Sequence, residues 1–179
     1  MVYKDKGDKD PMRKWFVENC SPGDFSGSLA DAMKGADIFI GVSAPNVLSE
    51  ADIKAMAKDA IVFALANPDP EILPSDAHQI RDDIVMATGR SDFPNQVNNV
   101  LGFPFLFRGA LDAKATEITD KMLIAASKAL ASLTKEPVPQ DVLEAYGLKS
   151  LTFGPEYIIP KPFDSRLIDW VAKAVQNAA

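Results

Sequence analysis

The first half of the chain contains three short apolar runs of the right length for strands. They cover residues 38–42, 60–66 and 83–87. Apart from Asp83 at the start of the third run, none of them alternates polar with apolar side chains. Continuous apolar runs of this length are typical of strands that are buried on both faces. The pattern therefore predicts three strands in the interior of a sheet.

Helical segments flank these runs. A short helix is expected over residues 11–19, where a proline occupies the first helical position. Further helices are expected over 28–34, 50–58 and 75–81, and Ser49 is a plausible N-cap for the second of these three. Strands that alternate with helices indicate an α/β fold, in which a parallel sheet is joined by right-handed crossovers and carries helices on its faces.

The character of the chain changes after Gly102. An amphipathic pattern predicts a long helix over 116–134, which prolines end, and a shorter helix follows over 140–146. Residues 157–160 look extended, and the last helix is expected to begin with Asp164 as its cap. The second part of the chain is therefore predicted to be helical.

Composition narrows the class of protein. The chain has 179 residues, of which 47% are hydrophobic and 25% charged, and its formal net charge is −6. This balance is typical of a globular domain. The negative charge argues against a nucleic-acid-binding protein, which needs a basic face to neutralise phosphates. No stretch approaches the ~20 apolar residues that span a bilayer, so no membrane contact is expected.

Cys20 is the only cysteine, so the chain has no internal disulfide framework. A reducing cytoplasm is the expected location of such a protein. No histidine or lysine stands close to Cys20 to activate it, and we expect a passive thiol.

Loops rich in Gly, Pro and small polar residues follow all three predicted strands, at 41–45, 66–70 and 88–92. In open parallel sheets, ligands bind beyond the carboxyl ends of the strands, and residues of these types let a ligand approach the backbone closely. Turn formation alone would favour a similar composition in any one of these loops. Three such loops at one sheet edge predict a site for a nucleotide or an acid.

The segment 93–100 carries four side-chain amides within five positions, at Asn95, Gln96, Asn98 and Asn99. Amides donate and accept hydrogen bonds without carrying charge. They can therefore orient a carboxylate and a carboxamide together. The alternative is that these residues only cap helices and form turns.

Several charged residues near the loops allow more than one interpretation. Asp69 and Glu71 resemble a pair of metal ligands, but a proline-stiffened turn that leads into a helix is the favoured interpretation. His78 lies in the middle of a predicted helix, where a solvated surface position is favoured over a catalytic role.

Two arginines also allow either a structural or a ligand-binding interpretation. Arg90 and Asp92 flank Ser91 and are placed to pair with each other. Arg108 follows the amide segment, and either it holds a phosphate or carboxylate or it forms a structural ion pair.

Residues 35–108 resemble the NAD(P)-binding domain of bacterial malic enzymes, through the strings GADIFIGVS, ALANPDPEI, ATGRSDFPNQVNNVLGFPF and FRGALD. The tail over 153–167 is similar to the C-terminal end of the short form of that family. The resemblance implies a Rossmann-like domain whose first βαβ unit is missing. It places a partial NAD(P)-binding domain at 1–113 and a helical extension packed on it at 114–179.

The activity implied by the resemblance is the oxidative decarboxylation of (S)-malate to pyruvate and carbon dioxide, with NAD or NADP and with Mg²⁺ or Mn²⁺. Matching the family motifs onto this chain implies contacts to substrate from Asn67, Asn98 and Asn99. It implies contacts to the cofactor from Ser43, Ala44, Asn67, Gly89 and Asn98.

A complete member of the family would carry its catalytic tyrosine and lysine, its metal ligands and its glycine-rich turn before the position of Met1. We find none of these patterns in the sequence. The expectation is therefore a piece of an enzyme that is inactive alone and whose partners are the missing N-terminal part and further copies in a homo-oligomer. Its ligands would be malate and pyruvate.

Two other hypotheses remain. One is a non-catalytic module that binds a nucleotide or a malic enzyme subunit. A weaker one is another acid dehydrogenase of similar layout, against which the paired asparagines argue. In each case a half-sheet leaves an uncovered strand edge beside apolar surface, and we expect self-association or poor solubility.

Overall fold

The computed structural model describes residues 10–20 and 25–179. Its sheet has three parallel strands in the order β1-β2-β3. They are β1 (Ile38–Gly41), β2 (Ile61–Ala64) and β3 (Val85–Thr88). The register aligns the first residue of each strand with that of its neighbour, so that all three carboxyl ends meet at one edge. The predicted α/β fold with a parallel, Rossmann-like sheet is confirmed.

Four short helices accompany the sheet, and each lies at a predicted position. They are α1 (Pro11–Cys20), α2 (Leu29–Met33), α3 (Glu50–Ala55) and α4 (Pro74–Ile80). Ser49 caps α3 in a reciprocal pair of hydrogen bonds with Asp52, as its sequence position predicts.

Helix α3 ends three residues before the predicted end at Lys58, because an arginine binds its last turn. The guanidinium of Arg81 donates to the carbonyl oxygens of Ile53 and Met56 at 3.1 Å and of Ala57 at 2.8 Å. These bonds satisfy carbonyls that the end of a helix leaves without partners.

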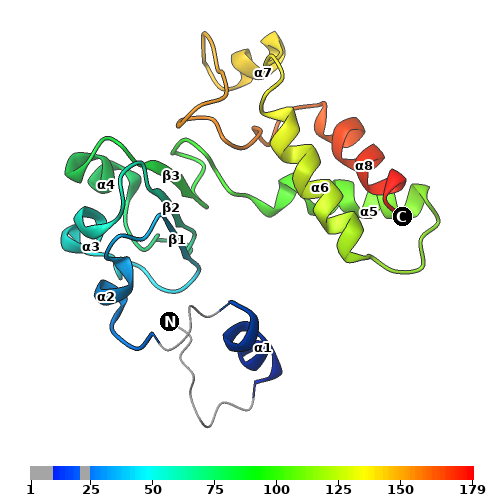
Figure 1. Cartoon of the computed structure of the whole chain (residues 1–179). Coiled ribbons are helices and arrows are strands. Elements are labelled where there is room, and N and C mark those ends of the chain that lie inside the picture. Colours follow the sequence, from blue (N-terminus) through cyan, green and yellow to red (C-terminus); the bar gives the residue numbers. More distant parts are fainter. Residues whose placement is uncertain (1–9, 21–24) are drawn as a thin grey trace.

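Within the described ranges, helices cover one face of the sheet, on the side where Figure 1 shows α2, α3 and α4, and leave the other face open. There Val62 and Met86 of the strands pack with Ile53 of α3 and Ala77 of α4. On the opposite face, the side chain of Ile40 in β1 is exposed. The prediction that the first strand is buried on both faces is therefore wrong, because β1 is an edge strand with one face uncovered.

This uncovered face leads to a testable prediction about association. Ile38 and Ile40 are 57% and 65% exposed, and Val42 just beyond the strand is 78% exposed. We expect the chain to self-associate through this apolar surface, and we expect Ile40→Lys to shift it toward monomer. Light scattering measures both. A monodisperse wild-type monomer would contradict the prediction, and Leu123→Lys, on the exposed side of a distant helix, is the matched control.

The second half of the chain is helical, as predicted. Its elements are the 3₁₀ turn η1 (Asn99–Leu101), α5 (Phe103–Asp112), α6 (Asp120–Leu133), α7 (Gln140–Ala145) and α8 (Leu167–Asn177). Helix α6 begins four residues after the predicted start, because Thr119 caps it by accepting from the amide of Met122. Helix α8 begins at Leu167, with Arg166 and not Asp164 as its N-cap residue. The prediction for Asp164 was therefore wrong, and its carboxylate instead accepts from the Arg166 amide and side chain.

Helices α5, α6 and α8 form a second core, separate from the one beside the sheet (Figure 1). Helix α5, which the sequence pattern did not predict, packs closely on α8 at Gly109. A Cβ added at Gly109 would lie 2.4 Å from the carbonyl oxygen of Ala172. Helix α5 thus shares its core with the tail, and the predicted boundary at residues 113 and 114 stays a prediction.

Asn95 connects the sheet with the tail. It is 2% exposed, and its Nδ2 donates to the carbonyl oxygens of Met86 in β3 at 2.8 Å and of Pro155 in the tail at 2.6 Å. Its Oδ1 accepts from the amide of Ile158 at 2.9 Å. In the described part of the chain, no helix is both long and apolar enough to cross a membrane.

Candidate functional site

The candidate site lies where the three strands end. In the sheet register Gly41 pairs with Ala64, and Ala64 with Thr88, so the loops that follow leave the sheet side by side. Side chains and backbone amides from these loops then converge beyond the carboxyl edge, where open parallel sheets bind ligands.

A buried carboxylate joins the first two loops. Glu71 is 0% exposed, and its Oε1 accepts from the amide of Ser43 at 2.8 Å and from the Ser43 hydroxyl at 3.2 Å. Its Oε2 accepts from the amide of Ala66 at 3.0 Å. Glu71 therefore fixes Ser43 and Ala66. The residues that follow them, Ala44 and Asn67, are predicted site residues.

An asparagine joins the second and third loops. The Asn67 side chain lies so close to Gly89 that a Cβ added at Gly89 would be 2.9 Å from Asn67 Nδ2. Nδ2 also donates to the carbonyl oxygen of Leu65 at 3.4 Å, and the residue as a whole is exposed. Only glycine leaves room for this contact, and the amide of Asn67 still has hydrogen-bonding capacity toward solvent.

The amide segment continues from the end of β3. Gln96 forms a parallel bridge with Thr88, and its Nε2 donates to the carbonyl oxygen of Gly89 at 3.4 Å. Asn98 caps η1, since its Oδ1 accepts from the amide of Val100 at 3.0 Å. Three of the four amides, with Asn95 included, thus have the structural role that the sequence left open.

Asn99 differs from these three. It is the exposed first residue of η1, and its side chain makes no hydrogen bond within the part of the chain that the structure describes. Its amide is therefore available to a ligand. Within the same part of the chain no hydrogen bond joins Asn99 to Asn67; Gln96 and Asn67 both contact Gly89.

The predicted site residues fall into two groups by exposure. Ser43, Ala44 and Asn67 are exposed in the loops that directly follow the strands, and Asn99 is exposed in η1, whereas Gly89 and Asn98 are half-buried. Hydrogen bonds and close contacts bring the three loops together, but the amide and hydroxyl protons of Ser43 are directed inward to Glu71.

The charged residues of the rim are paired. Arg90 Nε donates to Asp92 Oδ1 at 2.9 Å, and these side-chain hydrogen bonds hold the pKa of Asp92 below its ordinary value. Arg90 also lies 3.7 Å from Asp69. Arg108 pairs with Asp112 at 2.9 Å, which is the structural alternative that the sequence left open. His78 is exposed on α4, as expected for a surface position.

Asp69 and Glu71 do not act together as metal ligands. Glu71 is occupied by backbone amides, whereas Asp69 is exposed beside Arg90. Nor does Glu71 begin a helix, since α4 starts at Pro74. Across residues 10–20 and 25–179 there is no group of three or more His, Cys, Asp or Glu side chains that could hold a metal ion.

Sequence reasoning missed the role of Glu71. The carboxylate meets Ser43 across 28 positions of the chain, and no local pattern signals a contact of that separation. The structure explains the glycine at position 41, at the end of β1, by the same carboxylate: a Cβ at Gly41 would lie 2.5 Å from Glu71 Cδ.

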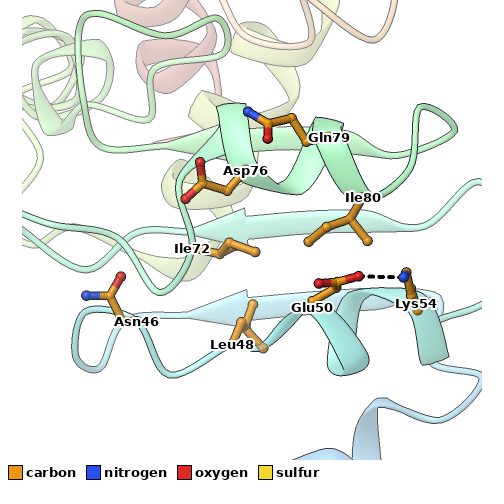
Figure 2. Close-up of a pocket in the computed structure, with 8 residues that line it drawn as sticks. All are labelled: Asn46, Leu48, Glu50, Lys54, Ile72, Asp76, Gln79 and Ile80. Atoms are coloured by element: carbon orange, nitrogen blue, oxygen red, sulfur yellow. Dashed lines mark hydrogen bonds and ion pairs between the residues drawn. The ribbon is translucent and has the colours of Figure 1, made fainter.

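A surface groove of about 460 Å³ runs between α3 and α4, and Asn46, in the segment that follows β1, stands at one end of it (Figure 2). Its lining includes the Glu50–Lys54 ion pair, with Asp76 and Gln79 on the opposite helix. Because this groove lies on the outer side of the helices and not at the strand ends, we place the candidate site at the rim.

The parallel sheet, its crossover helices and the glycine- and asparagine-bearing loops at its carboxyl edge define a Rossmann-like, nucleotide-binding class of protein. Residues 27–144 match the family model described as "Malic enzyme, NAD binding domain". Since that match covers more than half of the sequence, the chain belongs to the malic enzyme family.

Individual relatives agree with this assignment. The chain is 57% identical to the NADP-dependent malic enzyme of Halomonas elongata over 85% of its own length and 36% of that protein. It is 53% identical to the NADP-dependent malic enzyme of Rhizobium meliloti over 100% of its length and 23% of that protein. The structure superposes on the NAD-dependent malic enzyme of Thermotoga maritima with a TM-score of 0.83 at 36% identity, covering 99% of this chain and 43% of that one. The chain thus spans well under half of each relative.

Proposed function

We propose that the rim of this chain forms part of the binding site for NAD(P) and malate in a malic enzyme that converts (S)-malate to pyruvate and carbon dioxide. The observation that supports the proposal best is the convergence of Asn67, Gly89 and Gln96, which brings the exposed Asn67 and the amide segment together beyond the carboxyl edge of the sheet. This is the position at which Rossmann-like sheets receive the nicotinamide half of a dinucleotide.

The groups at the rim suit such a cofactor. Asn67 offers an exposed amide, and Gly89 offers backbone without a side chain. Neutral donors and acceptors of this kind match ribose hydroxyls and a carboxamide. In the proposal Ser43, Ala44 and Gly89 face the cofactor, Asn67 and Asn98 contact both ligands, and Asn99 orients a malate carboxylate.

The remaining chemistry is assigned to residues outside this chain. The bound cofactor accepts a hydride from C2 of malate, and the proposal gives the residues of this chain the task of binding and orienting both ligands. The described residues hold no metal-binding cluster, so the Mg²⁺ or Mn²⁺ ligands are placed in the rest of the enzyme, together with the acid and base. We therefore expect the isolated chain not to turn malate over.

A chimera tests this proposal. The chain matches the Rhizobium meliloti enzyme along all 179 residues, so it can replace the matched segment of that protein without a gap. The chimera, supplied with Mn²⁺, is expected to reduce NADP with malate and release pyruvate, whereas the 179-residue chain alone does neither. A folded but inactive chimera contradicts the proposed function.

The alternative is a module that binds a nucleotide or a malic enzyme subunit without catalysis. The neutral rim supports this alternative equally, since its charged residues Arg90, Asp92 and Asp69 are paired with one another. Calorimetry of the chain with NAD, NADP and malate distinguishes the two. Tight binding to the chain, combined with an inactive chimera, favours the module.

A further inference from the structure

We propose that Glu71 is a positioning residue for the cofactor site, and that through Ser43 it makes the first loop select hydroxyl or amide groups of the dinucleotide instead of its phosphates. This inference rests on the proposed function and goes beyond it. It names how the site is held and which part of the cofactor this loop receives.

The Glu71 carboxylate is held by hydrogen bonds within the described structure. Glu71 is fully buried, yet no cation pairs with it in the described structure, and its two oxygens are satisfied by Ser43 and Ala66 instead. A carboxylate buried in this way persists only where several donors replace its water. Removing it would leave two backbone N–H groups without acceptors.

Burial and hydrogen bonding act on this group in opposite directions. Burial raises the pKa of the Glu71 carboxyl, but hydrogen bonds from the amides of Ser43, Ala66 and Glu71 itself and from the Ser43 hydroxyl together outweigh that effect, and the net shift is downward from the ordinary glutamate value. The carboxylate is therefore ionised at neutral pH and acts only as an acceptor.

The hydrogen bonds of Glu71 connect the first loop with the second. The residues whose amides bind Glu71 directly precede Ala44 in the first loop and Asn67 in the second. The backbone of the same segment adds two more bonds, since the carbonyl oxygens of Pro70 and Glu71 accept from the amides of Asn46 and Leu48. The orientation of the peptide that leads into Asn67, and hence the contact of Asn67 with Gly89, depends on this network.

The Ser43 hydroxyl donates its proton to Glu71. A serine hydroxyl has one proton to donate and two lone pairs that accept. Because the proton of Ser43 is directed to Glu71 Oε1, only the lone pairs remain for a ligand at this exposed residue. A ribose hydroxyl or a carboxamide can donate to them. An ionised phosphate cannot, and the negative charge of Glu71 directly beneath the loop disfavours it further.

Substitution in the chimera tests the functional half of the inference. Glu71→Gln replaces one acceptor oxygen by an NH₂ group that faces an N–H donor, so one loop is released. We expect the KM for NADP to rise about tenfold while kcat changes less than about twofold, because the reacting groups lie elsewhere. Ser43→Ala should raise the KM for NADP to a similar extent. The double variant should raise it no more than about twofold beyond Glu71→Gln, since the two substitutions disrupt the same contact between Ser43 and Glu71. Glu117→Gln, at an exposed glutamate, is the matched control.

Amide hydrogen exchange on the 179-residue chain tests the positioning half without any activity measurement. In the wild type the amides of Ser43 and Ala66 should exchange slowly, and the amide of Ala44 should exchange fast. In Glu71→Gln one or both of the slow amides should lose protection, while the Val97 amide, bonded to the Thr88 carbonyl at 2.8 Å, stays protected.

The outcomes are distinct. An inactive wild-type chimera contradicts the proposed function itself. An active chimera in which Glu71→Gln leaves the KM for NADP unchanged, or in which the double variant shows the product of the two single effects, overturns the role of Glu71 alone. So does a wild-type chain in which Ser43 exchanges as fast as Ala44, a measurement that holds even where the variant fails to fold.

Discussion

Asn99→Ala in the active chimera is expected to lower kcat/KM for malate by about 100-fold, which corresponds to about 2.8 kcal/mol. The reason is that Asn99 is exposed in η1 and its side chain makes no hydrogen bond within the described part of the chain, so the amide is available to a malate carboxylate. Hydrogen bonds to charged groups are among the stronger polar contacts. Steady-state kinetics with malate as the varied substrate provide the measurement.

The melting temperature gives the matched comparison. Because Asn99 is exposed and its side chain makes no hydrogen bond within the described residues, the melting temperature of Asn99→Ala should equal that of the parent chimera. Asn177→Ala removes an equally exposed amide at the far end of α8 and should leave the kinetics unchanged. A loss shared by both variants, or the absence of any loss in Asn99→Ala, would contradict the assignment of Asn99 to the substrate.

Asn95→Ala is expected to lower the free energy of unfolding of the 179-residue chain by about 3 kcal/mol. Three hydrogen bonds are lost, and they leave the carbonyl of Met86 and the amide of Ile158 without partners in a buried region. The residue also has a φ of 55°, which alanine adopts less readily than asparagine. Urea unfolding followed by the fluorescence of Trp170 measures the loss.

Asn46→Ala is the control for the backbone contribution. Asn46 has a φ of 57° but is exposed, so it carries the same conformational cost without the buried hydrogen bonds. Its effect should remain below about 1.5 kcal/mol. Equal destabilisation by the two substitutions would show that Asn95 matters only for its turn and not as the link between sheet and tail.

The strands, and the loops rich in glycine and small polar residues that follow them, could be predicted from local pattern. Continuous apolar runs marked all three strands, and the Gly- and Asn-bearing segments after them do lie at one edge. The exposure of Ile40 could not be predicted from its run. An apolar strand has the same sequence whether or not another element covers its second face.

Helix α5 was missed because its sequence contains Pro104 and Gly109, residue types that disfavour the interior of a helix. In the structure Pro104 stands in the first turn, where proline is tolerated, and Gly109 lies where α8 packs against the helix. That packing is a contact distant in sequence, which the local pattern does not show.

The organisation of the site depends on contacts that are distant in sequence. Glu71 binds Ser43 across 28 positions and Asn95 binds the tail across 60 or more. Because nothing near either residue indicates its partner, the sequence predicts which loops carry ligand-binding groups but not which residues hold those loops in place.

Hydrogen exchange of the chimera with and without NADP tests most directly whether the dinucleotide binds at the strand ends. Bound NADP is expected to slow exchange in peptides that cover residues 42–45, 66–70 and 88–99, with no change in α3 and α4, which form the walls of the groove. Protection confined to that groove, or none at the three loops while the cofactor is bound, would contradict the account.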